Sequence, residues 1–183
     1  MNNYFKKLNI NFEIPTIYLG KNEINYGLEI NNQFHGIWYD EITNSEDIDF
    51  KKFVNNKDCK INLLQANSYI PPHTDSDIEA IINFYIRTDR CITQFYYPND
   101  DPEAVAEGVD AQTDGAVFHE GYMKKSVRFM AHPGDAYLLD VSKPHSVIPT
   151  QPGLTDRRCI CMQLLYKSFD EAVEMLQETG YLD

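Results

Sequence analysis

Long apolar runs and basic clusters are both missing from this sequence of 183 residues. No segment approaches the roughly 20 consecutive apolar residues that a membrane-spanning helix needs. The opening stretch, MNNYFKKLNINFEIP, also lacks the apolar core of a signal peptide. We therefore expect a cytoplasmic protein with no membrane partner.

Positive charge is scarce as well. The chain has 16 Lys and Arg against 28 Asp and Glu, which gives a formal net charge of -12. Proteins that bind nucleic acid usually present a basic patch to the phosphates, whereas the basic residues here are scattered along the chain. Nucleic acid is therefore a disfavoured partner.

Cysteine is sparse, and its spacing excludes two common uses. Cys59, Cys91, Cys159 and Cys161 contain no paired CxxC spacing of the kind that binds zinc. In a reducing compartment we expect free thiols rather than disulfides, packed as small buried hydrophobic residues.

The sequence is rich in short apolar runs separated by Gly, Pro, Asn and Asp. Its length fits a single domain, residues 1–183, that can bury its own core. Such runs are typical of β-strands, and their number predicts a mainly β fold, a sandwich or a barrel. The runs are INFEIP, KINLLQANSYI, EAIINFYIRT, CITQFYY, SVRFMA, DAYLLDV and RRCICMQLLY.

Two segments have helix signals. The clearer one is 168–179, where Ser168 and Glu171 have the spacing of a capping box and Gly180 follows the end. Its apolar stripe, Phe169, Val173 and Leu176, predicts packing against an outer face of the β fold. A second helix, SEDIDFKKFVN, is expected from Ser45 within the N-terminal strands and helix of residues 1–59.

The tripeptide His73-Thr74-Asp75 places an imidazole and a carboxylate two residues apart. In an extended chain both side chains project to the same side. Such a pair can bind a metal, relay a proton or face water. His145 follows the run DAYLLDV, and two histidines with one carboxylate form the ligand set of non-haem Fe(II) oxygenases. The remaining histidines, His35, His119 and His132, lack such a partner, and we interpret them as ordinary.

Four stretches in order carry a family resemblance: PPHTDS with INFYIRTDRCITQFYY, then GDAYLLDVSKPHSV, then RRCICMQLLY. Together they resemble the core of the Fe(II)/2-oxoglutarate-dependent dioxygenases, in the small prolyl-hydroxylase-like and phage-type branch, over about residues 60–166. The resemblance implies a double-stranded β-helix, or jelly-roll barrel, with a few flanking α-helices. It also implies Fe(II) bound by His73, Asp75 and His145, with 2-oxoglutarate as cosubstrate and O2 as co-reactant.

The resemblance further implies a basic residue on the last core strand that pairs with the distal carboxylate of 2-oxoglutarate. Alternation puts Arg157, Cys159 and Cys161 on one face, and puts Arg158 on the other with apolar residues. Because the family turns the apolar residues of this strand outward, the alternation favours Arg157 as the residue that points into the pocket and binds 2-oxoglutarate. If the strand faced the other way, Arg158 would have that role. Tyr85 matches a cosubstrate-binding tyrosine or is a packed core residue.

The implied activity is hydroxylation of a protein side chain or a small metabolite, with release of succinate and CO2. A nucleic-acid or nucleotide oxygenase of the same family and a non-catalytic, cupin-like metal-binding jelly roll are the alternatives. The insertion 98–125 forms either an acidic rim that attracts cationic substrates or a solvated loop. Its carboxylates are Asp100, Asp101, Glu103, Glu107, Asp110, Asp114 and Glu120.

Overall fold

The described part of the chain is mainly β, with eleven strands and one α-helix. The computed structural model describes residues 4–10, 12, 25–30, 33–39, 58–75, 77–99, 101–105 and 115–183. Within these residues lie β1 (Phe5–Lys7), β2 (Asn25–Ile30), β3 (Gln33–Tyr39), β4 (Cys59–Ala66), β5 (Ile70–His73), β6 (Ala80–Arg87), β7 (Ile92–Tyr96), β8 (Lys125–Met130), β9 (Ala136–Asp140), β10 (His145–Ile148), β11 (Arg157–Leu164) and α1 (Phe169–Glu178), with two 3-10 turns, η3 (Pro102–Ala104) and η4 (Glu120–Tyr122).

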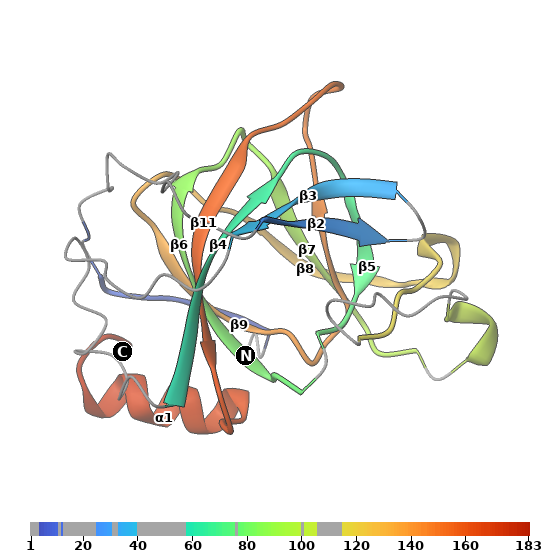
Figure 1. Ribbon diagram of the computed structural model, residues 1–183. Helices are drawn as coiled ribbons and strands as arrows, with labels where there is room; N and C mark the ends of the chain where they lie inside the picture. The colour runs from blue at the N-terminus through green and yellow to red at the C-terminus, as the bar shows by residue number, and fades with distance from the viewer. Residues whose placement is uncertain are drawn as a thin grey trace.

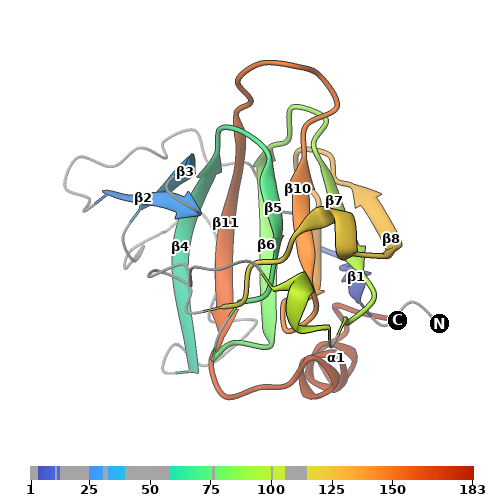
Figure 2. The ribbon, with the colours of Figure 1, turned by 90° about the vertical axis from the view of Figure 1, so that its right-hand side faces the viewer.

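The strands form two antiparallel sheets that face each other (Figure 1). The larger sheet has the order β1-β9-β6-β11-β4-β3-β2, and the smaller one has the order β5-β10-β7-β8. From β4 to β11 the chain crosses repeatedly between the two sheets, which is the double-stranded β-helix, or jelly roll, predicted from the sequence. Figure 2 shows β4, β11 and β6 side by side in the larger sheet.

The core has two layers because the larger sheet is buried on both faces. On β11, Cys159 and Cys161 point between the sheets, whereas Ile160, Met162 and Leu164 pack on the outer side. Successive residues of a strand point to opposite faces, so this register follows from the alternation in the sequence.

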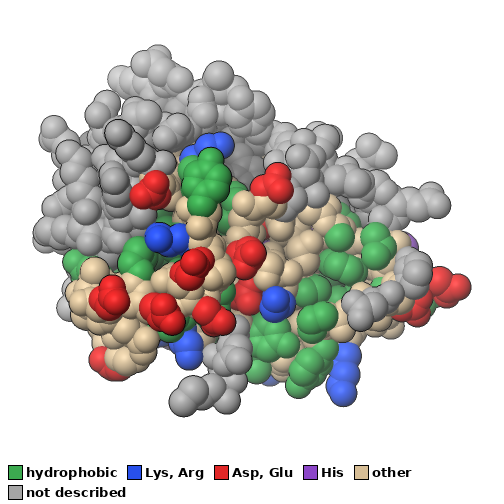
Figure 3. Space-filling view, turned by 90° about the horizontal axis from the view of Figure 1, so that it is seen from below, with side chains coloured by type: hydrophobic (Ala, Val, Ile, Leu, Met, Phe, Trp, Pro, Cys, Tyr) green, Lys and Arg blue, Asp and Glu red, His purple; other side chains and the backbone are tan. Residues whose placement is uncertain are grey.

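Helix α1 covers the outer layer, as predicted. Ser168 and Glu171 form the expected capping box, and Gly180 follows the helix at φ +78. Phe169 and Leu176 are buried against the sheet, and Val173 is partly buried. The acidic residues of α1 lie on its exposed face, as Figure 3 shows from below; they are Asp170, Glu171, Glu174 and Glu178.

One predicted strand is described only in part. Within the run INFEIP, Ile10 and Phe12 lie outside any strand, the other four positions lie outside the described residues, and the first described strand is β1. Phe5 of β1 pairs with Leu139 at the edge of the larger sheet. Ile10 and Phe12 are apolar because they pack on the outer layer, where the Phe12 ring lies 5.5 Å from that of Phe84.

The remaining strand predictions each contain a described strand, although KINLLQANSYI divides into β4 and the start of β5. The helix expected from Ser45 lies outside the described residues. In the part of the chain that is described, no helix is both long enough and apolar enough to span a membrane.

Candidate metal centre

The three predicted metal ligands meet at one point. His73 ends β5, Asp75 follows it by two residues, and His145 begins β10. One ligand atom from each residue lies within 4.8 Å of the others, and the distance from His73 Nε2 to Asp75 Oδ1 is 3.6 Å. Among the described residues this is the one group of side chains with the spacing of a metal site.

Sheet pairing brings the two histidines together. β10 runs between β5 and β7, with His145 opposite both His73 and Phe95. The two imidazole rings have centroids 4.3 Å apart, and the Phe95 ring lies 5.7 Å from that of His145. The cluster is therefore set by the backbone register of the smaller sheet.

Backbone carbonyls fix the tautomer of both histidines. His73 Nδ1 lies 2.8 Å from the carbonyl oxygen of Pro71, and His145 Nδ1 lies 3.0 Å from that of Lys143. Because a carbonyl oxygen only accepts, each Nδ1 carries the proton and donates it. The lone pair of each Nε2 is then free for a metal, which is the usual arrangement of metal-binding histidines.

Burial keeps His145 neutral. It lowers the pKa of His145 well below 6.5, and the neighbouring His73 and the positive charge of Arg157 lower it further. A neutral imidazole is the form that binds a metal ion.

Arg157 is a buried cation that has no acidic partner among the described residues. Its side chain is 3% exposed, and Nη2 donates to Tyr85 Oη at 3.1 Å and to Thr93 Oγ1 at 3.4 Å. Burial raises the pKa of Tyr85, so the hydroxyl stays neutral. In the described part of the chain, no carboxylate pairs with this guanidinium. A buried charge without a counter-ion is costly, which makes this position suited to an anionic ligand.

Arg158 has a different environment. Its guanidinium pairs with Asp156, with Nη2 donating to Oδ2 at 3.1 Å, and Arg87 donates to the same carboxylate. The charge of Arg158 is therefore already paired with Asp156, and this pair lies outside the space between the sheets.

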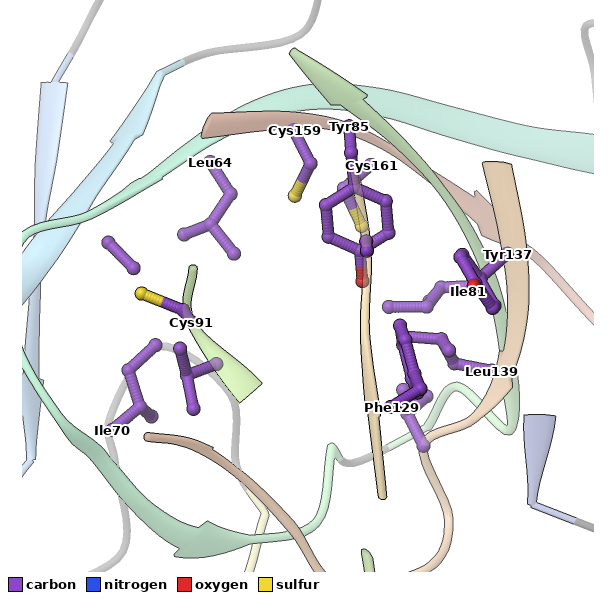
Figure 4. Close-up of a cluster of buried hydrophobic side chains, with 14 of the residues drawn as sticks. Leu64, Ile70, Ile81, Tyr85, Cys91, Phe129, Tyr137, Leu139, Cys159 and Cys161 are labelled. Atoms are coloured by element: carbon purple, nitrogen blue, oxygen red, sulfur yellow. The ribbon is translucent and has the colours of Figure 1, made fainter. Parts of the chain in front are cut away.

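Two thiols and a tyrosine line the inner face of the larger sheet beside the metal site. Cys159, Cys161 and Tyr85 point into the space between the sheets, as Figure 4 shows. Burial raises the pKa of Cys161, and the charge of Asp75 raises it further, so this thiol lies within electrostatic reach of the metal ligands. All four cysteines are buried and free, which agrees with the expectation of unpaired thiols packed as small hydrophobic residues.

Two polar residues of this wall were given no role in the sequence interpretation. Thr93 contacts Arg157, and Asn83 shares the inner face of β6 with Tyr85. Among the described residues, Asn83 Oδ1 is the one buried side-chain polar atom without a hydrogen-bond partner. Alternation along β6 places Asn83 inside, but an unpaired acceptor has no signature in sequence.

The other histidines lie apart from the cluster. His35 is buried and contacts the carbonyl of Tyr69, while the His132 side chain is 78% exposed beside Asp135. His119 packs near Tyr122 on the insertion.

The acidic insertion is described in part. Asp101 and Glu103 are exposed, whereas Asp100, Glu107, Asp110 and Asp114 lie outside the described residues. Glu120 is not a free rim carboxylate, because it accepts from Tyr69 Oη at 2.7 Å and pairs with Lys125 at 3.3 Å.

Comparison with family models and with curated proteins gives no match. Solved structures similar to this chain include the non-heme alpha ketoglutarate dependent epimerase SnoN from nogalamycin biosynthesis, with 11% identity over 78% of this chain and 65% of that chain at a TM-score of 0.46.

Two further structural neighbours are a hydroquinone 1,2-dioxygenase from Sphingomonas and a vicilin from hazelnut, Corylus avellana. The dioxygenase has 12% identity over 64% of this chain and 68% of its own, with a TM-score of 0.40. The vicilin has 12% identity over 82% of this chain at a TM-score of 0.42, and this chain spans 35% of the vicilin's length. At such similarity, the chemistry of this chain must be argued from its own residues.

Proposed function

We propose that this protein is an Fe(II)- and 2-oxoglutarate-dependent dioxygenase that hydroxylates a protein side chain or a small metabolite and releases succinate and CO2. One observation carries the proposal. Three side chains with the spacing of a metal site, and a buried arginine that has no carboxylate partner among the described residues, face the same interior of a jelly-roll barrel. The metal site alone would not select this chemistry, because many jelly rolls bind metals. The buried arginine alone would indicate only an anionic ligand.

The residues fit the metal. Two imidazoles with free Nε2 atoms and one carboxylate form the 2-His-1-carboxylate set that favours non-haem Fe(II) and leaves coordination positions open. His73, Asp75 and His145 would hold the ion. When bound, Fe(II) together with 2-oxoglutarate and O2 supplies the oxidising equivalents for hydroxylation.

The wall beside the metal fits the cosubstrate. Arg157 would bind the distal carboxylate of 2-oxoglutarate through its guanidinium, and Tyr85 would donate its hydroxyl proton to the same group. Tyr85 Oη accepts from Arg157, and because a phenol hydroxyl is also a donor, its proton would be donated to the ligand when the ligand is bound. The apolar side chains between the sheets, among them Leu64, Ile70 and Phe129, would exclude bulk water from the site.

A turnover experiment tests this proposal. The protein is incubated with Fe(II) and 2-oxoglutarate without O2, and succinate is then measured after O2 is admitted, with and without candidate substrates. We expect O2-dependent succinate release that some peptides or metabolites stimulate. Tight iron binding without any succinate would instead identify the non-catalytic jelly-roll alternative, and stimulation by oligonucleotides alone would identify the nucleic-acid oxygenase.

A further inference from the structure

Strand β5, which ends at the metal ligand His73 and leads into Asp75, has few pairing positions in its own sheet. β5 pairs with β10 at two positions, His145 with His73 and Val147 with Ile70, and the register shifts between them. The middle of β5 is Pro71-Pro72, and proline has no backbone N–H to donate. Backbone pairing with β10 therefore leaves the ligand-bearing end of β5 with few of the bonds that a strand normally has.

The insertion supplies bonds from the other side. Its returning leg, residues 115–118, which we term the clamp segment, lies antiparallel to β5 with Val117 opposite His73. Thr74 N donates to the carbonyl oxygen of Ala116 at 2.9 Å, and Ala116 N donates to Thr74 Oγ1 at 3.2 Å. Thr74, the central residue of the tripeptide, is thus bound through both its backbone and its side chain.

Two more backbone bonds extend this contact. Phe118 N donates to the carbonyl oxygen of Pro72 at 2.8 Å, so the proline carbonyl has a partner although the proline lacks a donor. On the opposite side, Asp75 N donates to the carbonyl oxygen of Val141 at 3.0 Å. The ligand pair is therefore fixed between the clamp segment and the body of the barrel.

Gly115 makes the close approach possible. A Cβ atom at this position would lie 1.6 Å from the carbonyl oxygen of Thr74 and 3.3 Å from Asp75 Cα. Both are backbone atoms, so a side chain cannot be accommodated by a rotamer change. Any larger residue must displace the clamp segment or the backbone between His73 and Asp75.

We propose that the clamp segment positions the metal ligands, with Gly115 and Thr74 as its positioning residues. The inference rests on the proposed metal site. It gives the insertion a role beyond that of a rim or a solvated loop, because its return to β5 sets the geometry of His73 and Asp75. Supporting contacts of this kind typically change metal affinity by about 10–100-fold.

The chain offers a matched pair of glycines for the test. Gly115 and Gly121 lie on the same insertion and neither has a positive φ, but a Cβ at Gly121 meets nothing within 4 Å. Fe(II) is titrated anaerobically, and Co(II) in parallel, into wild type, Gly115→Ala and Gly121→Ala, with calorimetric detection. We expect about 10–100-fold weaker binding for Gly115→Ala and wild-type binding for Gly121→Ala.

The side-chain bond gives a second test that does not depend on Gly115→Ala folding. Thr74→Val keeps the shape and removes the acceptor for Ala116 N, whereas Thr74→Ser keeps the acceptor. We expect Thr74→Val to weaken metal binding and Thr74→Ser to retain it, while the metal-free variants unfold at similar temperatures.

The outcomes separate the two proposals. If the wild type binds no metal, the proposed function and the clamp both fail. If the wild type binds metal and both Gly115→Ala and Thr74→Val bind it equally well, the clamp alone is overturned and the insertion returns to being a solvated loop.

Discussion

His73 and His145 stand directly opposite each other on neighbouring antiparallel strands, with ring centroids 4.3 Å apart. The 71 residues between them in the chain include β6 to β9, so the contact depends on the whole jelly roll. Both rings donate Nδ1–H to carbonyls two residues earlier, at Pro71 and Lys143. The two strand ends thus present their imidazoles in the same way.

The first prediction follows from this pair. His145→Ala removes one of three ligands, so anaerobic Fe(II) titration should show a larger loss than the roughly 10–100-fold expected for a supporting contact. His132→Ala is the control, because its ring is 78% exposed and lies outside the cluster. Unchanged iron binding in His145→Ala would contradict the ligand assignment.

The second prediction concerns the unpaired amide oxygen. Asn83 is 3% exposed and its Oδ1 has no hydrogen-bond partner among the described residues, and a buried acceptor in this state costs about 1–3 kcal/mol. Asn83→Leu, which has a similar branched shape, should therefore raise the free energy of unfolding of the ligand-free protein. Urea denaturation measures this change.

Asn83→Asp is the contrasting variant. It puts a carboxylate into the same buried position, so we expect it to destabilise the fold at neutral pH. A lower urea midpoint for Asn83→Leu would contradict this prediction and would mean that the hydrogen bond between the Asn83 amide and Tyr85 outweighs the cost of the unpaired Oδ1.

Period-two alternation accounts for the parts that the sequence predicted well. On β11 it separates Cys159 and Cys161, which point between the sheets, from the apolar residues of the outer layer. Because both faces of this strand are buried, the residue types on each face indicate which core layer they belong to. The capping box at Ser168 was predictable for a similar reason, because it is a local motif.

The parts that escaped prediction depend on contacts distant in sequence. The sequence around Gly115 does not indicate that this glycine lies against the backbone carbonyl of Thr74. β1 is a three-residue edge strand with the sequence FKK, too short to show alternation. The proximity of the metal ligands was inferred with the help of a family resemblance, since the spacing of His73 and Asp75 alone favours a solvated turn.

The third prediction is a pH dependence at the N-terminal strand. Lys7 Nζ lies 2.6 Å from Asp135 Oδ1 and joins β1 to the turn before β9. Burial raises the pKa of Asp135, but Lys7 and the backbone N–H of His132 outweigh it and hold the pKa below 3.8. Asp135 also raises the pKa of Lys7 above 10.5.

The ion pair between Lys7 and Asp135 should stabilise the fold fully between about pH 4 and pH 10, where both groups are charged in the folded and the unfolded protein. Its contribution should be lost as pH falls through the lowered pKa of Asp135. Lys7 is more than half exposed, so we expect a contribution of about 0–1 kcal/mol. Urea midpoints of wild type and Lys7→Met, measured from pH 2 to 7, should converge at the acidic end. A difference that grows toward pH 2 would contradict the pairing.

The last prediction separates the two arginines of β11. Arg157 is buried against Tyr85 and Thr93 and pairs with no carboxylate of the described residues, whereas Arg158 is already paired with Asp156. If Arg157 binds the distal carboxylate of 2-oxoglutarate, Arg157→Ala leaves that anion unpaired in a buried site. The expected loss of binding free energy is about 2–5 kcal/mol.

Arg158→Ala should weaken the binding free energy of 2-oxoglutarate by only about 0–1 kcal/mol. It removes a partly exposed ion pair with Asp156 that does not face the interior. Iron affinity should be nearly unchanged in both variants, since all three metal ligands come from other segments. Anaerobic titration of 2-oxoglutarate into the iron-loaded variants, followed by the charge-transfer absorption of the complex, measures both effects. A larger loss in Arg158→Ala would mean that the cosubstrate binds on the other face of β11, and the assignment of Tyr85 as its second contact would then fail with that of Arg157.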